Sequence, residues 1–242
     1  MALELLYIGI WFIATLIIAT IAALLGKRYG LVFPAVMFVG AIVIANVVAQ
    51  KIIVIGPFTS SAGLVVFSIT FLLTDTISEF WGRKVANRVV WSGFMAYVML
   101  VFVTWVSVQL TPASFWGGQE AFALIFGSAP RIALASVLAY IAGQTHDVWA
   151  FHFWKKKTRG KHLWFRNNAS TWVSQTIDTL IFVTIAFYGI FPIYTLILST
   201  IFLKIVIGAV DTPFLYFIRW YYEKTGKPWK QKSDHMGVVP GV

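Results

Sequence analysis

The sequence predicts an all-α fold, a polytopic bundle of transmembrane helices in one domain. Of its 242 residues, 59% are hydrophobic and only 12% are charged, and the mean hydropathy is +0.81. Soluble domains carry about 25% charged residues, so this chain has too little polar surface to face water on all sides. The chain also contains several apolar stretches of about 20 residues, the length that a membrane-crossing helix requires.

Seven segments are long and apolar enough to cross a bilayer, at about 5–25, 31–49, 61–81, 87–110, 121–152, 171–190 and 194–219. The fifth is longer than a bilayer requires, so we expect its C-terminal part to project from the membrane. We assign residues 1–222 to a single transmembrane domain and residues 223–242 to a short basic cytoplasmic tail. The first segment has its basic residues after the apolar run, which is typical of a retained helix rather than a signal peptide.

Lysine and arginine gather in alternate loops, at 26–30, 82–88, 153–168 and in the tail, whereas the intervening loops hold almost none except Lys51. Basic loops mark the cytoplasmic side of membrane proteins. The pattern predicts an N-terminus outside and a C-terminus in the cytoplasm. A six-span alternative, in which the first segment does not cross, leaves the other orientations unchanged.

The net charge of +10 comes mainly from these loops, so it does not indicate a nucleic-acid partner. The absence of cysteine excludes disulfides, thiolate metal sites and cysteine nucleophiles. His146 and His152 are six residues apart and do not share a helical face, so they do not predict a metal site. We expect the lipid bilayer as a partner, and no metal, cofactor or nucleic acid.

Polar residues inside the apolar segments are the candidate functional residues, because an ionisable group in the bilayer costs a few kcal/mol unless it finds a partner or a cavity. Asp75 and Glu79 are four residues apart and project from one face. Glu79 has the alternative of an interfacial salt bridge with Arg83. Asn46 and Gln50, also four apart, are either site residues or make hydrogen bonds between helices.

The fifth segment places Gln144 and Asp147 on one face, three residues apart. It also carries small residues at four-residue steps, Ala135, Ala139 and Gly143, which predict a close helix-packing face. Arg131, early in this segment, is expected either at the outer interface or beside an intramembrane acid.

The sixth segment carries the most polar stripe, with Thr171, Ser174, Gln175, Asp178 and Thr179 along one face. Asn168 or Ser170 is expected to cap its N-terminus, but capping does not explain Asp178, which lies two turns further in. The stripe therefore predicts the wall of a cavity. In the last segment, Lys204 and Asp211 are too far apart to pair, so each is expected to meet another helix, with Asp178 as a candidate partner for Lys204.

Three blocks together resemble one known family. They are TFLLTDTISEFWGRKVANR at 70–88, GQTHDVWAFHFWKK at 143–156 and RNNASTWVSQTIDTLIFVTIAF at 166–187. Their combination resembles the queuosine precursor transporter family, formerly named for vitamin uptake, over about residues 40–219. The resemblance implies a six-helix core like that of the substrate-binding subunits of energy-coupling-factor transporters. Segment 5–25 is then an extra N-terminal helix.

The resemblance implies a plasma (cell inner) membrane importer of 7-deazaguanine bases, the precursors of queuosine, and not an enzyme. The substrate-binding residues that it implies are Asn46, Asp75, Glu79, Gln144, Asp147, Ser174, Gln175 and Asp178. An alternative is a vitamin-capture subunit that depends on a separate ATPase, since the chain has no phosphate-binding loop of its own. An intramembrane hydrolase using Ser92 is less favoured, and homo-oligomerisation stays open.

The chemistry of a guanine-like base suits these residue types. One carboxylate accepts two adjacent N–H groups while an amide meets the carbonyl, and such a site rejects analogues that leave its own groups unpaired. We expect Asp75, Glu79 and Asp178 to line one cavity between the third, fifth and sixth segments. Surplus negative charge there would attract a cationic aminomethyl base. Phe67, Phe71 and Trp172 are near enough to stack on it.

Overall fold

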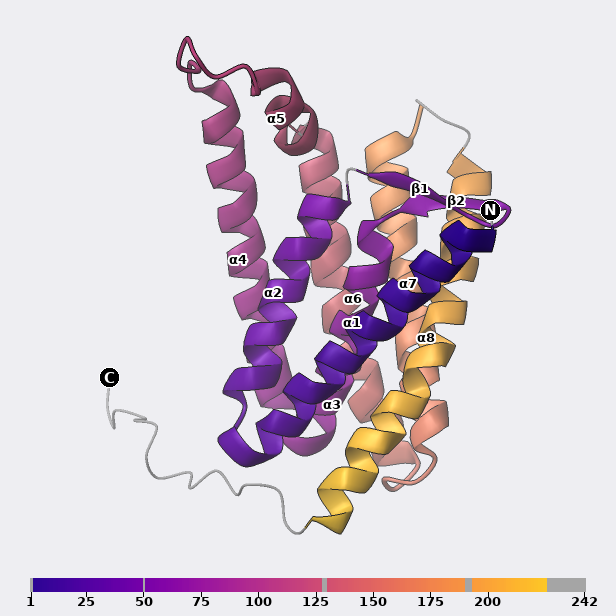
Figure 1. Ribbon diagram of the computed structural model, residues 1–242. Coiled ribbons are helices and arrows are strands. Elements are labelled where there is room, and N and C mark those ends of the chain that lie inside the picture. Colours follow the sequence, from indigo (N-terminus) through magenta and orange to yellow (C-terminus); the bar gives the residue numbers. More distant parts are fainter. Residues whose placement is uncertain (1, 50, 128–129, 190–192, 226–242) are drawn as a thin grey trace.

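The computed structural model is a helical bundle, and it describes residues 2–49, 51–127, 130–189 and 193–225 (Figure 1). Within these ranges the all-α prediction is confirmed, and the one addition is a short β-hairpin. The elements in order are α1 (Ala2–Tyr29), α2 (Val32–Val48), β1 (Ile52–Ile55), β2 (Phe58–Ser61), α3 (Gly63–Phe80), α4 (Arg83–Gln109), α5 (Gln119–Phe126), α6 (Pro130–Lys157), α7 (Leu163–Phe187) and α8 (Ile193–Lys224).

Two glycines allow the chain to reverse between long helices without a loop. Gly30 has φ 89° between α1 and α2, and Gly82 has φ 86° between α3 and α4. This left-handed region is open to glycine at little cost, whereas a side chain would be strained there. Each glycine therefore ends one helix and starts the next within a few residues.

The structure divides the fifth predicted segment, 121–152, into two helices. Helix α5 ends at Phe126 with Gly127 as its C-cap, and α6 begins at Pro130. Proline has no N–H to donate and disfavours helical backbone in the residue before it, so it starts a helix rather than continuing one. Hydropathy alone does not detect this break.

Helix α7 begins at Leu163, well before the start near 171 that the sequence predicted. His162 occupies the N-cap position, so the expectation that Asn168 or Ser170 caps this helix was wrong. The Asn168 amide instead donates to Trp164 O at 2.9 Å and to Thr212 Oγ1 on α8, also at 2.9 Å. Polar residues in this stretch meet α8, and the helix continues through them.

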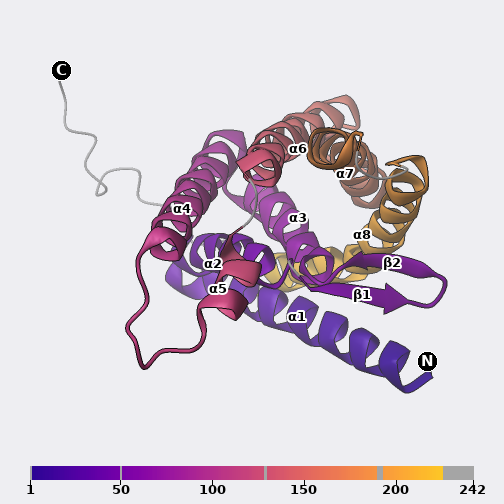
Figure 2. The ribbon, with the colours of Figure 1, turned by 90° about the horizontal axis from the view of Figure 1, so that it is seen from above.

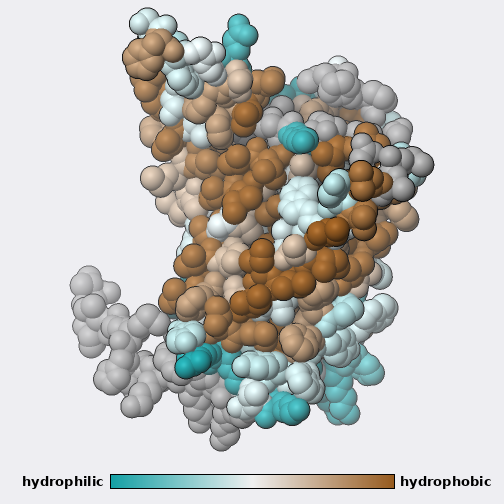
Figure 3. All heavy atoms as spheres, in the orientation of Figure 1, coloured by the Kyte–Doolittle hydropathy of each residue, from teal (hydrophilic) through white to brown (hydrophobic). Residues whose placement is uncertain are grey.

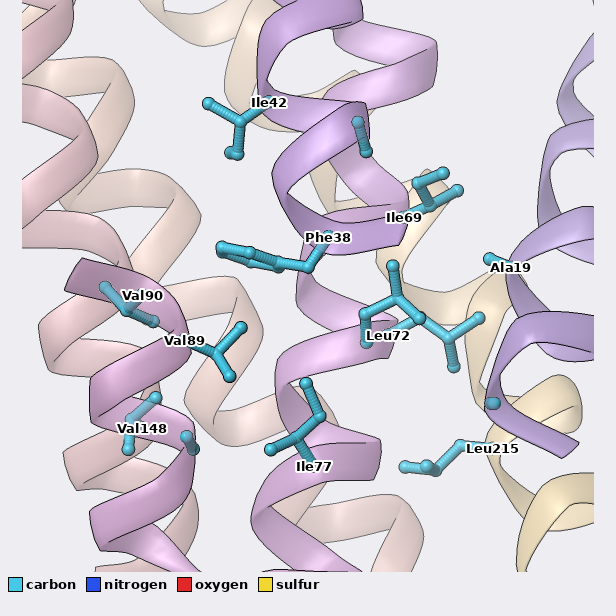
Figure 4. Close-up of a cluster of buried hydrophobic side chains, with 14 of the residues drawn as sticks. Ala19, Phe38, Ile42, Ile69, Leu72, Ile77, Val89, Val90, Val148 and Leu215 are labelled. Atoms are coloured by element: carbon cyan, nitrogen blue, oxygen red, sulfur yellow. The ribbon is translucent and has the colours of Figure 1, made fainter. Parts of the chain in front are cut away.

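Helix α3 lies at the centre of the bundle when it is viewed along the helices (Figure 2). In its apolar window 83% of the residues are buried, against 22% for α4, which exposes most of its surface. Phe38 and Ile42 of α2 pack with Leu72 and Ile77 of α3 and with Val89 of α4 in the core (Figure 4). The central helix is therefore placed to carry polar groups away from lipid.

Helix α1 lies against α2, α3 and α8 on the outside of the bundle. It is joined to α8 near its C-terminal end, where Lys27 Nζ donates to Tyr222 O at 2.6 Å and Tyr222 Oη donates to Ala23 O at 2.8 Å. The opposite face of α1 exposes large apolar side chains, among them Leu6, Ile10 and Ile17.

The two ends of the bundle differ in composition. The β-hairpin and α5 lie at one end, which we call the hairpin end (Figure 1). We call the other the basic end, because it holds the basic residues that follow or precede the long helices, Lys27, Arg28, Arg83, Lys84, Lys155, Arg166 and Lys224. Between them runs a broad apolar belt, and hydrophilic residues gather toward the basic end (Figure 3). Four of the described helices are long and apolar enough to cross a membrane by length and composition.

Candidate functional site

A cavity of about 950 Å³ lies in the hairpin half of the bundle. Its wall is built by β2 and by every described helix except α1. The wall is mostly apolar and includes aromatic side chains, among them Phe67, Tyr97, Trp105, Tyr140 and Phe182. Its volume falls within the range of about 300–1,000 Å³ that is usual for small-molecule sites.

Asp178 of α7 and Lys204 of α8 form an ion pair on the cavity wall, with Lys204 Nζ 2.5 Å from Asp178 Oδ2. They are the only charged side chains among the described residues that line the cavity. Their side chains remain 11% and 7% exposed, so the pair is shielded from lipid yet accessible from the cavity. The pairing of Lys204 with Asp178 that the sequence suggested is confirmed.

Polar groups without charge lie on the same wall. Thr179 follows Asp178, Thr200 lies one turn before Lys204, and Asn46 of α2 also lines the cavity. The Asn46 amide donates to Ile42 O at 2.8 Å, within its own helix. Gln50, which the sequence analysis paired with Asn46, lies outside the described residues.

Close packing of α6 on α7 positions Asp178. A Cβ atom built on Gly143 would lie 3.0 Å from Asp178 Cβ and 3.3 Å from Ser174 O, so only glycine lets the helices approach this closely. Ala135 and Ala139 on the same strip of α6 are buried. The predicted close helix packing is therefore confirmed at Gly143, whereas Ala139 lines the cavity.

A buried amide layer lies one turn nearer the basic end than Asp178. Gln144 of α6 donates through Nε2 to Thr70 Oγ1 of α3 at 2.9 Å. Ser174 Oγ of α7 donates to Ser170 O at 2.6 Å and lies 2.9 Å from His146 Nδ1. Gln175 is also buried. These residues lie beneath the cavity and are not on its wall.

Three carboxylates form the next layer, Asp75 of α3, Asp147 of α6 and Asp211 of α8, each no more than 3% exposed. The Thr171 hydroxyl lies 3.3 Å from Asp75 Oδ2 and 3.5 Å from Asp147 Oδ1, so one side chain of α7 bridges two acids. Thr74 lies 3.3 Å from Asp147 Oδ2. Asp75 is thus on the same side of α3 as the α6–α7 pair but deeper than the cavity.

Glu79 lies at the basic end in a cluster of cations. Its carboxylate lies 2.7 Å from Lys155 Nζ, 2.6 Å from Arg166 Nη2 and 3.8 Å from Arg219 Nη1, which come from α6, α7 and α8. Among the contacts within the described ranges, the salt bridge with Arg83 that the sequence allowed is not formed. Gly82 ends α3 before Arg83, so the two residues do not belong to one continuous helix.

Of the eight residues that the family resemblance implied, Asn46 and Asp178 line the cavity, and the other six lie between it and the basic end. Sequence reasoning did not place Lys204 or Arg166 among the site residues. A lysine in the middle of an apolar segment was the signal for Lys204. Arg166 gave no such signal because it lies in a stretch that resembles a loop, yet it is fully buried, with its guanidinium 5.1 Å from the Phe151 ring centroid.

Arg131 lies at the hairpin end of the bundle and is exposed. Its Nε donates to Ile185 O at 2.5 Å and its Nη2 to Tyr188 O at 2.8 Å, so it caps the C-terminal end of α7 at the hairpin end. Cationic side chains at this position satisfy the last carbonyls and complement the helix dipole.

An apolar bundle with buried polar layers and an internal cavity is typical of one class of protein, the multi-pass membrane transporter. Residues 61–218 match a family described as "Putative vitamin uptake transporter". The chain is 34% identical over 210 residues, 85% of its length, to the "Probable queuosine precursor transporter" of Bacillus subtilis, covering 92% of that relative. The chain belongs to the queuosine precursor transporter family, and it is a transporter rather than an enzyme.

Two further relatives carry the same name over shorter stretches. The "Queuosine precursor transporter" of Escherichia coli is 30% identical over 144 residues, 60% of this chain and 62% of the relative. That of Haemophilus influenzae, named as probable, is 30% identical over 131 residues, 54% of this chain and 53% of the relative. No solved structure matches the chain. The likeness to energy-coupling-factor subunits therefore stays an expectation.

Proposed function

We propose that this protein imports a queuosine-precursor 7-deazaguanine base across the plasma (cell inner) membrane and binds it in the cavity beside Asp178 and Lys204. The observation that carries this proposal is the ion pair on the wall of a largely apolar, aromatic-lined cavity of about 950 Å³. The names of its relatives supply the substrate class.

The wall suits a flat heterocycle. Aromatic side chains stack on base rings with about 1–3 kcal/mol per base where this has been measured on nucleic acids. Phe67 lies beside the ion pair, with its ring centroid 5.8 Å from Lys204 Nζ. A base that stacks there presents its polar edge to the charged groups. Buried charged groups favour a ligand that satisfies them and disfavour one that does not.

The charge distribution supports an orientation for the bundle in the membrane. Basic residues mark the cytoplasmic side, so the basic end is proposed to face the cytoplasm, which leaves the cavity in the outer half of the membrane. The N-terminus then lies outside and the C-terminus inside. The packed amide, carboxylate and Glu79 layers lie between the cavity and the cytoplasm, which fits a transporter that has yet to release its substrate inward.

Uptake of a radiolabelled 7-deazaguanine base by the purified protein in liposomes tests the proposal. We expect uptake by the wild-type protein and none by empty liposomes. Guanine-type bases should compete with the label, and pyrimidines should not. Folded protein that neither binds nor transports any deazapurine would overturn the proposal. Uptake only after addition of a separate ATPase would instead support the alternative of a vitamin-capture subunit.

A further inference from the structure

We propose that Lys204 is a specificity-determining residue, which binds the ring carbonyl of the base while Asp178 accepts hydrogen bonds from its two neighbouring N–H groups. This inference rests on the proposed function and deepens it. It assigns a role to a residue outside the three sequence blocks that resemble the family, and it specifies which hydrogen-bonding edge of the base the site recognises.

The placement of the pair argues for a role in binding. A buried ion pair costs about as much in desolvation as it gains from attraction, and well-packed apolar residues often stabilise a protein as well or better. Asp178 and Lys204 belong to different helices and meet on the cavity wall rather than in the packed layers below it. Both side chains keep some exposure, so a ligand in the cavity can reach them.

Both partners have hydrogen-bonding capacity to spare. An ammonium has three N–H donors, and in the described part of the chain Lys204 uses one of them, toward Asp178 Oδ2. A carboxylate has two oxygens with about four acceptor positions. The neighbouring Phe67 ring, 5.8 Å from Nζ, attracts the ammonium but accepts no conventional hydrogen bond. The pair is therefore held in place without being saturated.

The order of these groups complements a guanine-type edge. That edge presents an exocyclic amine, a ring N–H and a carbonyl in a row, that is, two donors followed by one acceptor. Asp178 Oδ1, Asp178 Oδ2 and Lys204 Nζ present two acceptors followed by one donor, with Nζ only 2.5 Å from Oδ2. An adenine-type edge has an amine in place of the carbonyl. Its N–H donor would face the N–H donors of the Lys204 ammonium, and no hydrogen bond would form.

The same geometry revises the electrostatics expected of the site. Lys204 offsets the charge of Asp178, and the cavity wall has no other charged side chain among the described residues. The sequence predicted surplus negative charge in the site, but the charge of Asp178 is offset by Lys204. The site recognises a neutral edge, and a cationic substituent elsewhere on the base is not required for binding to this pair.

Binding measurements on the purified wild-type protein and on Lys204→Met test this inference. The probes are a 7-deazaguanine, its analogue without the exocyclic amine, and the corresponding 6-amino analogue without the carbonyl. We expect the wild type to prefer the carbonyl-bearing bases. In Lys204→Met that preference should fall by about tenfold to a hundredfold, the range for loss of one charged hydrogen bond. Lys204→Arg, which keeps a donor, should restore much of it.

Two further variants keep the test informative. Lys204→Met leaves Asp178 without its counter-ion, so the double variant Asp178→Asn with Lys204→Met, which removes both charges, serves as a folding control only and is expected to bind none of the bases tightly. Lys224→Met removes a lysine from the last turn of the same helix, far from the cavity, and should bind like the wild type. Thermal unfolding in detergent identifies which variants remain folded.

The outcomes separate this inference from the proposed function. Folded Lys204 variants that weaken all three bases equally would show that Lys204 is a counter-ion only, and the inference would be overturned while uptake of deazaguanines stands. A wild-type protein that binds none of the bases would overturn both.

Discussion

The hairpin half and the basic half of this bundle contain the same kinds of polar residue but pack them differently. In the hairpin half, Asp178 and its lysine partner face an open cavity. In the basic half, Asp75, Asp147 and Asp211 are enclosed by hydroxyl and amide groups from neighbouring helices. The comparison shows that polar residues in membrane helices either face a cavity or pack against one another, and that only the first group is open to a ligand.

The packed half has a role that the open half does not. Glu79 joins α3 to α6, α7 and α8 through three cations. These contacts and the carboxylate layer lie between the cavity and the basic end. If the base leaves on that side, as the proposed function requires, we expect these contacts to oppose separation of the four helices.

The largest effect is expected from replacing Asp178 with asparagine. The variant keeps its size but loses the charge that pairs with Lys204 and accepts from the base, so uptake of 7-deazaguanine should fall below the detection limit of a radiolabel assay. Glu120→Gln is the matched acid-to-amide control, because Glu120 is exposed on α5, and it should transport normally. Normal uptake by folded Asp178→Asn would remove this residue from the site.

A large loss of stability is expected from Glu79→Ala. Removing one partner of a buried ion pair costs about 3–5 kcal/mol, and here Arg166 is fully buried with no other carboxylate in ion-pair contact among the described residues. The melting temperature in detergent should drop clearly. Glu223→Ala, which breaks an exposed ion pair with Arg219, should change it little. If Glu79→Ala melts at the same temperature as the wild type, the ion pairs of Glu79 do not stabilise the packing of the four helices.

Chemical labelling sharpens the contrast between the two halves, and the chain suits it because it contains no cysteine. Thr200→Cys on the cavity wall should react with a membrane-impermeant thiol reagent added outside intact cells, and substrate should slow the reaction. Ser170→Cys in the packed half should stay unlabelled. Labelling of Thr200→Cys only from the cytoplasmic side would reverse the proposed orientation.

A smaller effect is expected from Gly143→Ala. The added Cβ would press on Asp178 Cβ at 3.0 Å, so α6 and α7 must shift by a few tenths of an ångström, and uptake should fall several-fold with little loss of folded protein. Gly40→Ala on α2 is the control, since a Cβ there meets nothing within 4 Å and alanine is the better helix former. If both variants transport like the wild type, close packing at Gly143 does not position Asp178.

Residue spacing predicted directions around each helix well. The polar face of α7 and the small residues on one face of α6 follow from helical periodicity. The meeting of Lys204 with Asp178 depends on packing between two helices, for which periodicity gave no more than a candidate pair. Spacing did not predict which turn of a helix faces the cavity. Residues on one face at successive turns point in the same direction, and they differ only in the neighbouring helices that they meet. Asp178 faces the cavity, whereas Thr171, two turns away on the same face, lies between two buried acids.

The sequence by itself determined the class of this protein, because a chain with so few charged residues is stable only with lipid around it, and its three polar blocks identify the family. Tertiary structure alone decided which polar residues surround a void, which cations meet Glu79, and that Arg166 is buried. These properties depend on contacts between helices distant in sequence, where the side chains of one helix fill or leave open the space beside another.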